Sequence, residues 1–173
     1  METPNEALRA ELREMFRVDQ ELRNKAIKDW DNHELASEIM EVDRRNTARM
    51  HQIVDAYGWL GKTLVGEDGA NAAWLLVQHA DADREFQKRC LELMIAAGPD
   101  EVPPSNLALL VDRVRVGEGR PQVYGTQFWT DENDRFGPCA IEDETLVDER
   151  RAGMGLGPLA EYKKTMMDLY HPE

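Results

Sequence analysis

Residues 66–86 read Gly66-Glu67-Asp68-Gly69-Ala70-Asn71-Ala72-Ala73-Trp74-Leu75-Leu76-Val77-Gln78-His79-Ala80-Asp81-Ala82-Asp83-Arg84-Glu85-Phe86. Apolar side chains recur in this stretch at steps of three and four residues, and the pattern predicts one helix that continues to about Ala97. His79 falls inside the apolar stripe of that helix. A buried imidazole needs a hydrogen-bond partner, and Asp83, one turn further on, is expected to accept a hydrogen bond from the ring. The other ring nitrogen would then be available as a general base.

Helical spacing also recurs in other parts of the chain. The predicted helices cover residues 5–28, a segment that ends at Tyr57 before Gly58, a short segment after Pro103, and residues 144–154 and 158–169. The stretch from Gly61 to Gly69 is expected to be a loop. Residues 122–130 are rich in strand-forming side chains, and residues 138–141 follow a polar turn, which together predict a hairpin. We therefore expect a mostly α fold, a helical bundle of about five to six helices with a small β-hairpin packed on one side or end.

The chain has 173 residues, which is the size of one ordinary domain. We expect a single domain over residues 1–173, with a helical part over 5–116, the hairpin over 120–142 and C-terminal helices over 144–170. A homodimer stays open as the oligomeric state.

Charge excludes several classes of partner. Lys and Arg total 21 against 34 Asp and Glu, so the net charge is −13, which repels nucleic acid and anionic membrane surfaces.

The chain has no run of about 18 apolar residues, and residues 1–6 lack the layout of a signal peptide, so a cytoplasmic location is expected. Cys90 and Cys139 fit no zinc spacing and are interpreted as a reduced pair.

Polar residues on inward faces form the main set of site candidates. Asp43 and Asn46 extend the apolar stripe of the second predicted helix, Gln78 lies beside the histidine, and Asp19 lies on the apolar side of the first helix. Each such group costs about 1 to 3 kcal/mol if it is buried without a partner, so these groups should meet one another, water or a ligand. The alternatives are structural: a core histidine satisfied internally, Asp19 paired with Arg23, and Asp43 and Asn46 as helix caps.

The predicted strand and two later arginine positions supply candidates for substrate binding. Tyr124 and Gln127 are donors and acceptors of the kind that orient a small substrate. Arg113 and Arg151 are the cations best placed for an anionic substrate group, and their alternative role is in surface ion pairs.

Searches for standard cofactor motifs yield nothing. The chain has no Glu-x-x-His pair, no His-Glu-x-x-His helix, no glycine-rich phosphate loop after a strand and no Gly-x-Ser-x-Gly elbow. We therefore expect no metal and no cofactor. A metal site built from His79, Asp83, Asp19 and Asp43 is kept as an alternative.

The motifs Gln78-His79-Ala80-Asp81 and Tyr124-Gly125-Thr126-Gln127 occur together with Asp112-Arg113-Val114 and Val147-Asp148-Glu149-Arg150-Arg151. Over roughly residues 40 to 165 the chain resembles a family of uncharacterised bacterial proteins, a domain-of-unknown-function family. The resemblance implies no reaction or cofactor. It does imply which positions to test first, namely Gln78, His79, Asp81, Arg113, Tyr124, Gln127 and Arg151.

The preferred functional hypothesis is a small cofactor-independent enzyme. His79, tuned by Asp83 or Asp43, would act as general acid or base on a small polar or anionic substrate, in a cyclisation, elimination, isomerisation or hydrolysis. Gln78, Asn46, Tyr124 and Gln127 would orient the substrate, and Arg113 or Arg151 would stabilise negative charge. The alternatives are a non-catalytic module that binds a small ligand or a protein, and a metal-dependent enzyme that uses His79 and the aspartates.

Overall fold

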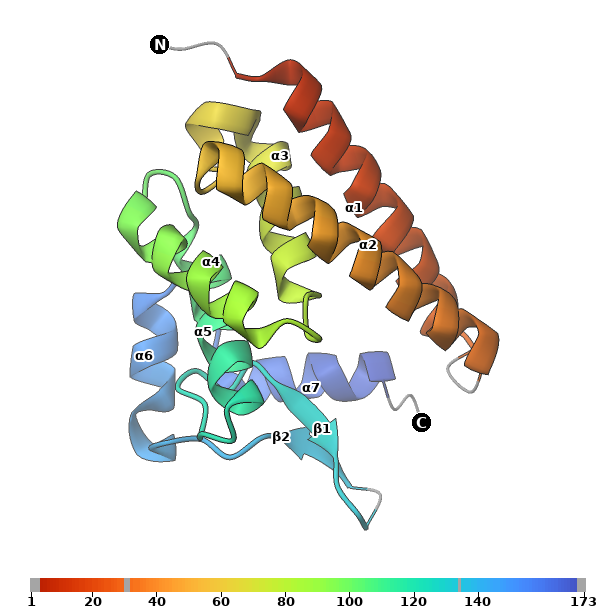
Figure 1. Cartoon of the computed structure of the whole chain (residues 1–173). Coiled ribbons are helices and arrows are strands. Elements are labelled where there is room, and N and C mark those ends of the chain that lie inside the picture. Colours follow the sequence, from red (N-terminus) through yellow and green to blue (C-terminus); the bar gives the residue numbers. More distant parts are fainter. Residues whose placement is uncertain (1–3, 30–31, 134, 171–173) are drawn as a thin grey trace. The chain divides into compact units, whose positions relative to one another are not determined.

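The computed structural model describes residues 4–29, 32–133 and 135–170, and it confirms a mostly α fold with a small β-hairpin (Figure 1). The chain divides into two compact units, Met1–Val102 and Pro103–Glu173, each of which is described by itself. The expected single domain over residues 1–173 stays a prediction. The expectation about the N-terminal residues falls largely on residues 1–3, which lie outside the described part.

The described residues of the first unit form the helices α1 (Glu6–Ala26), α2 (His33–Tyr57), α3 (Lys62–Gln78) and α4 (Arg84–Ala97). The helices α1 and α2 begin at asparagines whose side chains accept backbone N–H groups of the first turn, Asn5 and Asn32. Both helices pack along α3 (Figure 1). Their apolar faces form a core that includes Leu12, Met50 and Leu76. Gly58 ends α2, as predicted.

The start of α3 is fitted closely against α1. The sequence predicts a loop from Gly61 to Gly69, but α3 already begins at Lys62 and bends at Gly66, whose φ is +72°. A Cβ on Gly69 would lie 2.9 Å from the Val65 side chain. These positions need glycine because one takes a left-handed conformation and the other leaves no room for a side chain.

The long helix predicted through His79 is wrong, because the chain breaks between α3 and α4. His79 is the C-cap of α3, and residues 79–83 form a turn. The Asp83 side chain accepts the N–H of Phe86 at 3.0 Å and so starts α4 anew. Buried Gln87 donates its amide to the carbonyls of Val77 and Gln78, which satisfies the end of α3. Local hydrogen bonds therefore override a helical apolar spacing that runs unbroken through the turn.

The second unit contains α5 (Pro104–Gly117), β1 (Phe128–Thr130), β2 (Phe136–Pro138), the 3₁₀ turn η1 (Glu144–Leu146), α6 (Val147–Gly153) and α7 (Leu159–Tyr170). The two strands are antiparallel, with Trp129 opposite Gly137, and α7 contacts β2. The hairpin is shorter than predicted because residues 122–127 do not pair as a strand. Buried Asp112 accepts the backbone N–H groups of Val123, Tyr124 and Thr126 instead.

None of the described helices is long and apolar enough to cross a membrane.

Candidate functional site

His79 lies at the break between α3 and α4, where it meets a carboxylate from another helix. Its Nδ1 lies 2.9 Å from Oδ1 of Asp19, on α1, and the Asp19 side chain is only 1% exposed. An ionised carboxylate can only accept hydrogen bonds, so Nδ1 carries the proton in this pair. In the neutral ring Nε2 then keeps its lone pair, and Nε2 has no hydrogen-bond partner among the residues that the structure describes.

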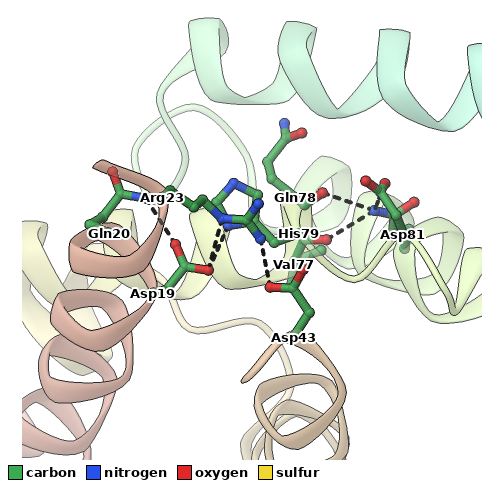
Figure 2. A network of polar contacts seen from close by, with 9 residues as sticks. Asp19, Gln20, Arg23, Asp43, Val77, Gln78, His79 and Asp81 are labelled. Carbon is green, nitrogen blue, oxygen red and sulfur yellow. Dashed lines mark hydrogen bonds and ion pairs between the residues drawn. The ribbon is translucent and has the colours of Figure 1, made fainter. Parts of the chain in front are cut away.

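Two carboxylates and a guanidinium surround the ring (Figure 2). Arg23 donates to Asp19 at 3.2 Å and to Asp43, on α2, at 2.6 Å. Gln20 also donates to Asp19, at 2.8 Å. The cluster Asp19–Arg23–Asp43–His79, which we call the dyad cluster, therefore draws its members from α1, α2 and the end of α3.

The surroundings in the dyad cluster change the pKa values of both aspartates. Burial alone would raise the pKa of Asp19, but the His79 and Gln20 hydrogen bonds and the charge of Arg23 hold this pKa below its ordinary value. The pKa of Asp43 is raised, because its burial outweighs its attraction to Arg23 and His79. Of the two aspartates, Asp19 is thus the one whose surroundings favour the ionised form.

The dyad cluster opens on a pocket of about 590 Å³ that lies wholly within the first unit. Its lining comes from α2 (Met40, Asp43, Arg44, Thr47, Ala48 and His51) and from the turn (His79, Asp81, Ala82 and Asp83). This size is in the range of small-molecule sites, and the lining mixes titratable groups with small apolar side chains.

The predicted pairing of His79 with Asp83 is wrong. Because the helix breaks, Asp83 turns away to cap α4, and its Oδ2 lies 2.8 Å from Nε2 of His51 instead. Asp19 takes the place that the sequence assigned to Asp83.

Two other predicted site residues stay near the pocket without lining it. Asn46 is buried on α2, one turn beyond Asp43, and its Nδ2 has no hydrogen-bond partner. Gln78 is buried, and its side chain points away from the dyad cluster (Figure 2). Their predicted role in substrate binding stays a prediction.

The remaining predicted binding residues belong to the second unit, where Arg151 holds the loop that contains Tyr124 and Gln127. Arg151 is 2% exposed and donates to the carbonyls of Tyr124 and Gly157 at 2.7 and 2.6 Å. The Gln127 amide donates to the hydroxyl of Thr126 at 3.1 Å. Arg113 is half-buried on α5. The interactions of Arg151 are those of a structural guanidinium, and burial lowers its pKa.

Sequence reasoning missed the role of His51 and the pairing of Asp19 with His79. A signal for the first existed, since Asp43, Thr47 and His51 recur at steps of four and so share one face of α2. Asp19 has no such signal, because its partner lies 60 positions away in the chain.

Asp19, Asp43 and His79 also have the donors of a metal site. One ligand atom from each lies within 4.8 Å of those of the other two. One imidazole nitrogen and two carboxylate oxygens suit a divalent cation such as Zn²⁺ or Mn²⁺. Arg23 already contacts both carboxylates, so its guanidinium would compete with such an ion.

Comparison with known proteins places the chain without assigning a reaction. A model of a family of unknown function, DUF6624, matches residues 6–172. Searches among curated proteins and among solved structures found no match.

Proposed function

We propose that the chain, which belongs to the family of unknown function DUF6624, is an acid/base enzyme in which His79 takes a proton from a small polar substrate and returns it. One observation carries the proposal. Nδ1 of His79 is hydrogen-bonded to the buried carboxylate of Asp19, while the ring lines a pocket. A general base needs a fixed tautomer and an open nitrogen beside the substrate, and this geometry supplies both.

Asp19 has a positioning role in this proposal. Its carboxylate holds the ring through Nδ1 and stabilises the imidazolium that forms when Nε2 accepts a proton. Because Asp19 is held by Gln20 and Arg23 as well, it keeps its position when the ring changes charge. No cofactor takes part in the proposed step.

The charges of the pocket favour an uncharged or cationic substrate over an anionic one. Among the described lining residues Asp43, Asp81 and Asp83 carry carboxylates, and Arg44 is the cation. Arg44 is itself paired with Glu41, at 2.7 Å. An anionic substrate group would meet net negative charge here, which disfavours binding.

A base can be tested without knowing the substrate, by using 5-nitrobenzisoxazole as the probe. When a base removes the carbon-bound proton of its five-membered ring, the N–O bond breaks and a coloured cyanonitrophenolate is released, so absorbance reports the rate. We expect His79→Gln to lower kcat/KM for this probe about 100-fold, the size of a general-base contribution.

His33→Gln is the matched control, because His33 is exposed at the first residue of α2 and does not line the pocket. Its rate should equal that of the wild type. Equal cleavage by wild type and His79→Gln would contradict the catalytic role and leave a non-catalytic binding module as the better proposal.

A metal-dependent enzyme is the second candidate, favoured by the convergence of Asp19, Asp43 and His79. These three residues would hold the ion, which would supply Lewis-acid chemistry when bound. Calorimetric titration with ZnCl₂ tests this site directly. We expect binding that is lost in His79→Gln and becomes about 10-fold tighter in Arg23→Gln, because that change removes the competing cation. If the affinity for Zn²⁺ is the same in the wild type and in both variants, the proposed metal site is rejected.

A further inference from the structure

A second imidazole, His51, lines the same pocket as His79. Its Nε2 lies 2.8 Å from Oδ2 of Asp83, so it too is held by a carboxylate. The hydrogen bond to His51 lowers the pKa of Asp83, so the ionised carboxylate accepts a hydrogen bond from Nε2–H of the ring. The pocket thus contains two histidines, each fixed through one nitrogen by an aspartate from a different element.

Two contacts hold the His51 ring, which is more exposed than the His79 ring, at 38% against 16%. Asp83 is itself fixed, since its other oxygen caps α4 through the N–H of Phe86. The Phe86 side chain, which is fully buried, stacks on His51 with ring centroids 4.0 Å apart. Within the described part of the chain Nδ1 of His51 has no hydrogen-bond partner. This nitrogen is therefore available to a bound molecule.

The two rings differ in the charges that surround them. Two carboxylates, Asp19 and Asp43, lie beside the His79 ring, and Arg23 contacts both of them. His51 faces Asp83, which no arginine contacts among the described residues, and it lies against an aromatic face. The two imidazoles thus have different surroundings, although both line the same pocket.

We infer that His51 is a second proton-transfer residue of this pocket and that the enzyme acts on substrates that need a base and an acid together, such as small uncharged carbonyl compounds. This inference rests on the proposed role of His79. In the step, Nε2 of His79 takes a proton from the carbon beside the carbonyl group. The electron pair of that C–H bond forms the C=C bond of an enol and the π pair of the C=O bond moves to oxygen, which receives the Nδ1 proton of a His51 ring protonated on both nitrogens. His51 is left neutral and His79 is left protonated. The reverse step restores both rings.

Two probe reactions distinguish the contribution of a catalytic acid from that of a catalytic base. Cleavage of 5-nitrobenzisoxazole requires a base alone, because the phenolate that leaves is a stable anion. Exchange of the carbon-bound protons of hydroxyacetone with D₂O, followed by proton NMR, requires a base for carbon and an acid for oxygen. We expect His51→Gln to lower the enzyme-catalysed exchange rate about 100-fold and to lower benzisoxazole cleavage far less, so the ratio of the two rates falls.

Asp83→Asn is the second variant. Asparagine is as good an N-cap as aspartate, so α4 is kept, while the carboxylate that holds the His51 ring is lost. It should slow exchange in the same direction as His51→Gln and affect cleavage far less. His79→Gln should lower the rates of both reactions about 100-fold, and circular dichroism melting shows that each variant is folded.

Each outcome has one meaning. Exchange that is unchanged in His51→Gln and Asp83→Asn, but lost in His79→Gln, overturns the role of His51 and leaves the proposed base intact. An equal loss of both reactions in folded His51→Gln assigns His51 a structural role and also overturns the inference. If the wild type does not exchange hydroxyacetone above the buffer rate but cleaves benzisoxazole, the inferred substrate class is wrong. Failure of both probes rejects the proposed function itself.

Discussion

Asp19 accepts hydrogen bonds from Gln20, Arg23 and His79 while its own side chain is almost wholly buried. A carboxylate in that position is stable only because each oxygen has donors, since an unpaired buried charge is strongly unfavourable. The same contacts that hold the histidine therefore also keep a negative charge inside the first unit. At this residue, the geometry of the site and the stability of the unit depend on the same hydrogen bonds.

The lowered pKa of Asp19 makes its contribution to folding dependent on pH. A carboxyl group with a lower pKa in the folded state stabilises the fold above its ordinary value of 3.8, and this contribution is lost as the pH falls below that value. We expect Asp19→Asn to lower the free energy of unfolding by about 2 kcal/mol near neutral pH. The difference from the wild type should shrink between about pH 5 and pH 3, as urea unfolding measures. A constant difference over this range would mean that Asp19 does not titrate with a lowered pKa.

The turn between α3 and α4 is the element on which the pocket depends. It places His79 at the end of one helix and Asp83 at the start of the next, so the two side chains can face different partners. Gln87 ties the two helices together by donating to both Val77 and Gln78. An uninterrupted helix would keep His79 one turn away from Asp83. The hydrogen bonds of His79 to Asp19 and of His51 to Asp83 would then be lost.

Replacing Gln87 tests whether this turn is held as described. Gln87→Ala leaves two carbonyls without their side-chain donor and opens a space in a fully buried position. We expect the free energy of unfolding to fall by about 2 kcal/mol, and benzisoxazole cleavage by His79 to fall because the ring loses its position. Exposed Glu85, also in the first turn of α4, provides the control as Glu85→Ala. A Gln87→Ala protein with wild-type stability and rate would show that other contacts hold the turn.

At the scale of the whole molecule, the sequence predicts the fold better than the site. Asn32 and Gly58 mark the ends of α2 because capping and stopping are local effects that a sequence displays directly. The break after Gln78 escapes such reasoning, because the apolar spacing continues across it. The partners of the two histidines escape it for another reason. Sequence spacing offers neighbours four residues away, whereas the structure pairs residues 60 and 32 positions apart.

The motif Tyr124-Gly125-Thr126-Gln127 shows the same limit in the second unit. The pattern predicts a strand with side chains ready for a substrate, but buried Asp112 and Arg151 bind its backbone. Gly125 has a φ of +70°, and a Cβ there would lie 2.8 Å from Leu159. Much of this distinctive motif is thus accounted for by a tightly held loop, which spacing alone does not distinguish from a binding site.

The two carboxylate oxygens of Asp83 face different parts of the first unit, and this arrangement has a further consequence. One receives the backbone N–H of Phe86, and the other receives the ring of His51. Any change in the charge of that ring alters the electron density on the carboxylate and hence the hydrogen bond to the Phe86 amide. The nuclear magnetic resonance signal of the Phe86 amide therefore reports changes in the charge of the His51 ring in the pocket. It can be measured before any natural substrate is known.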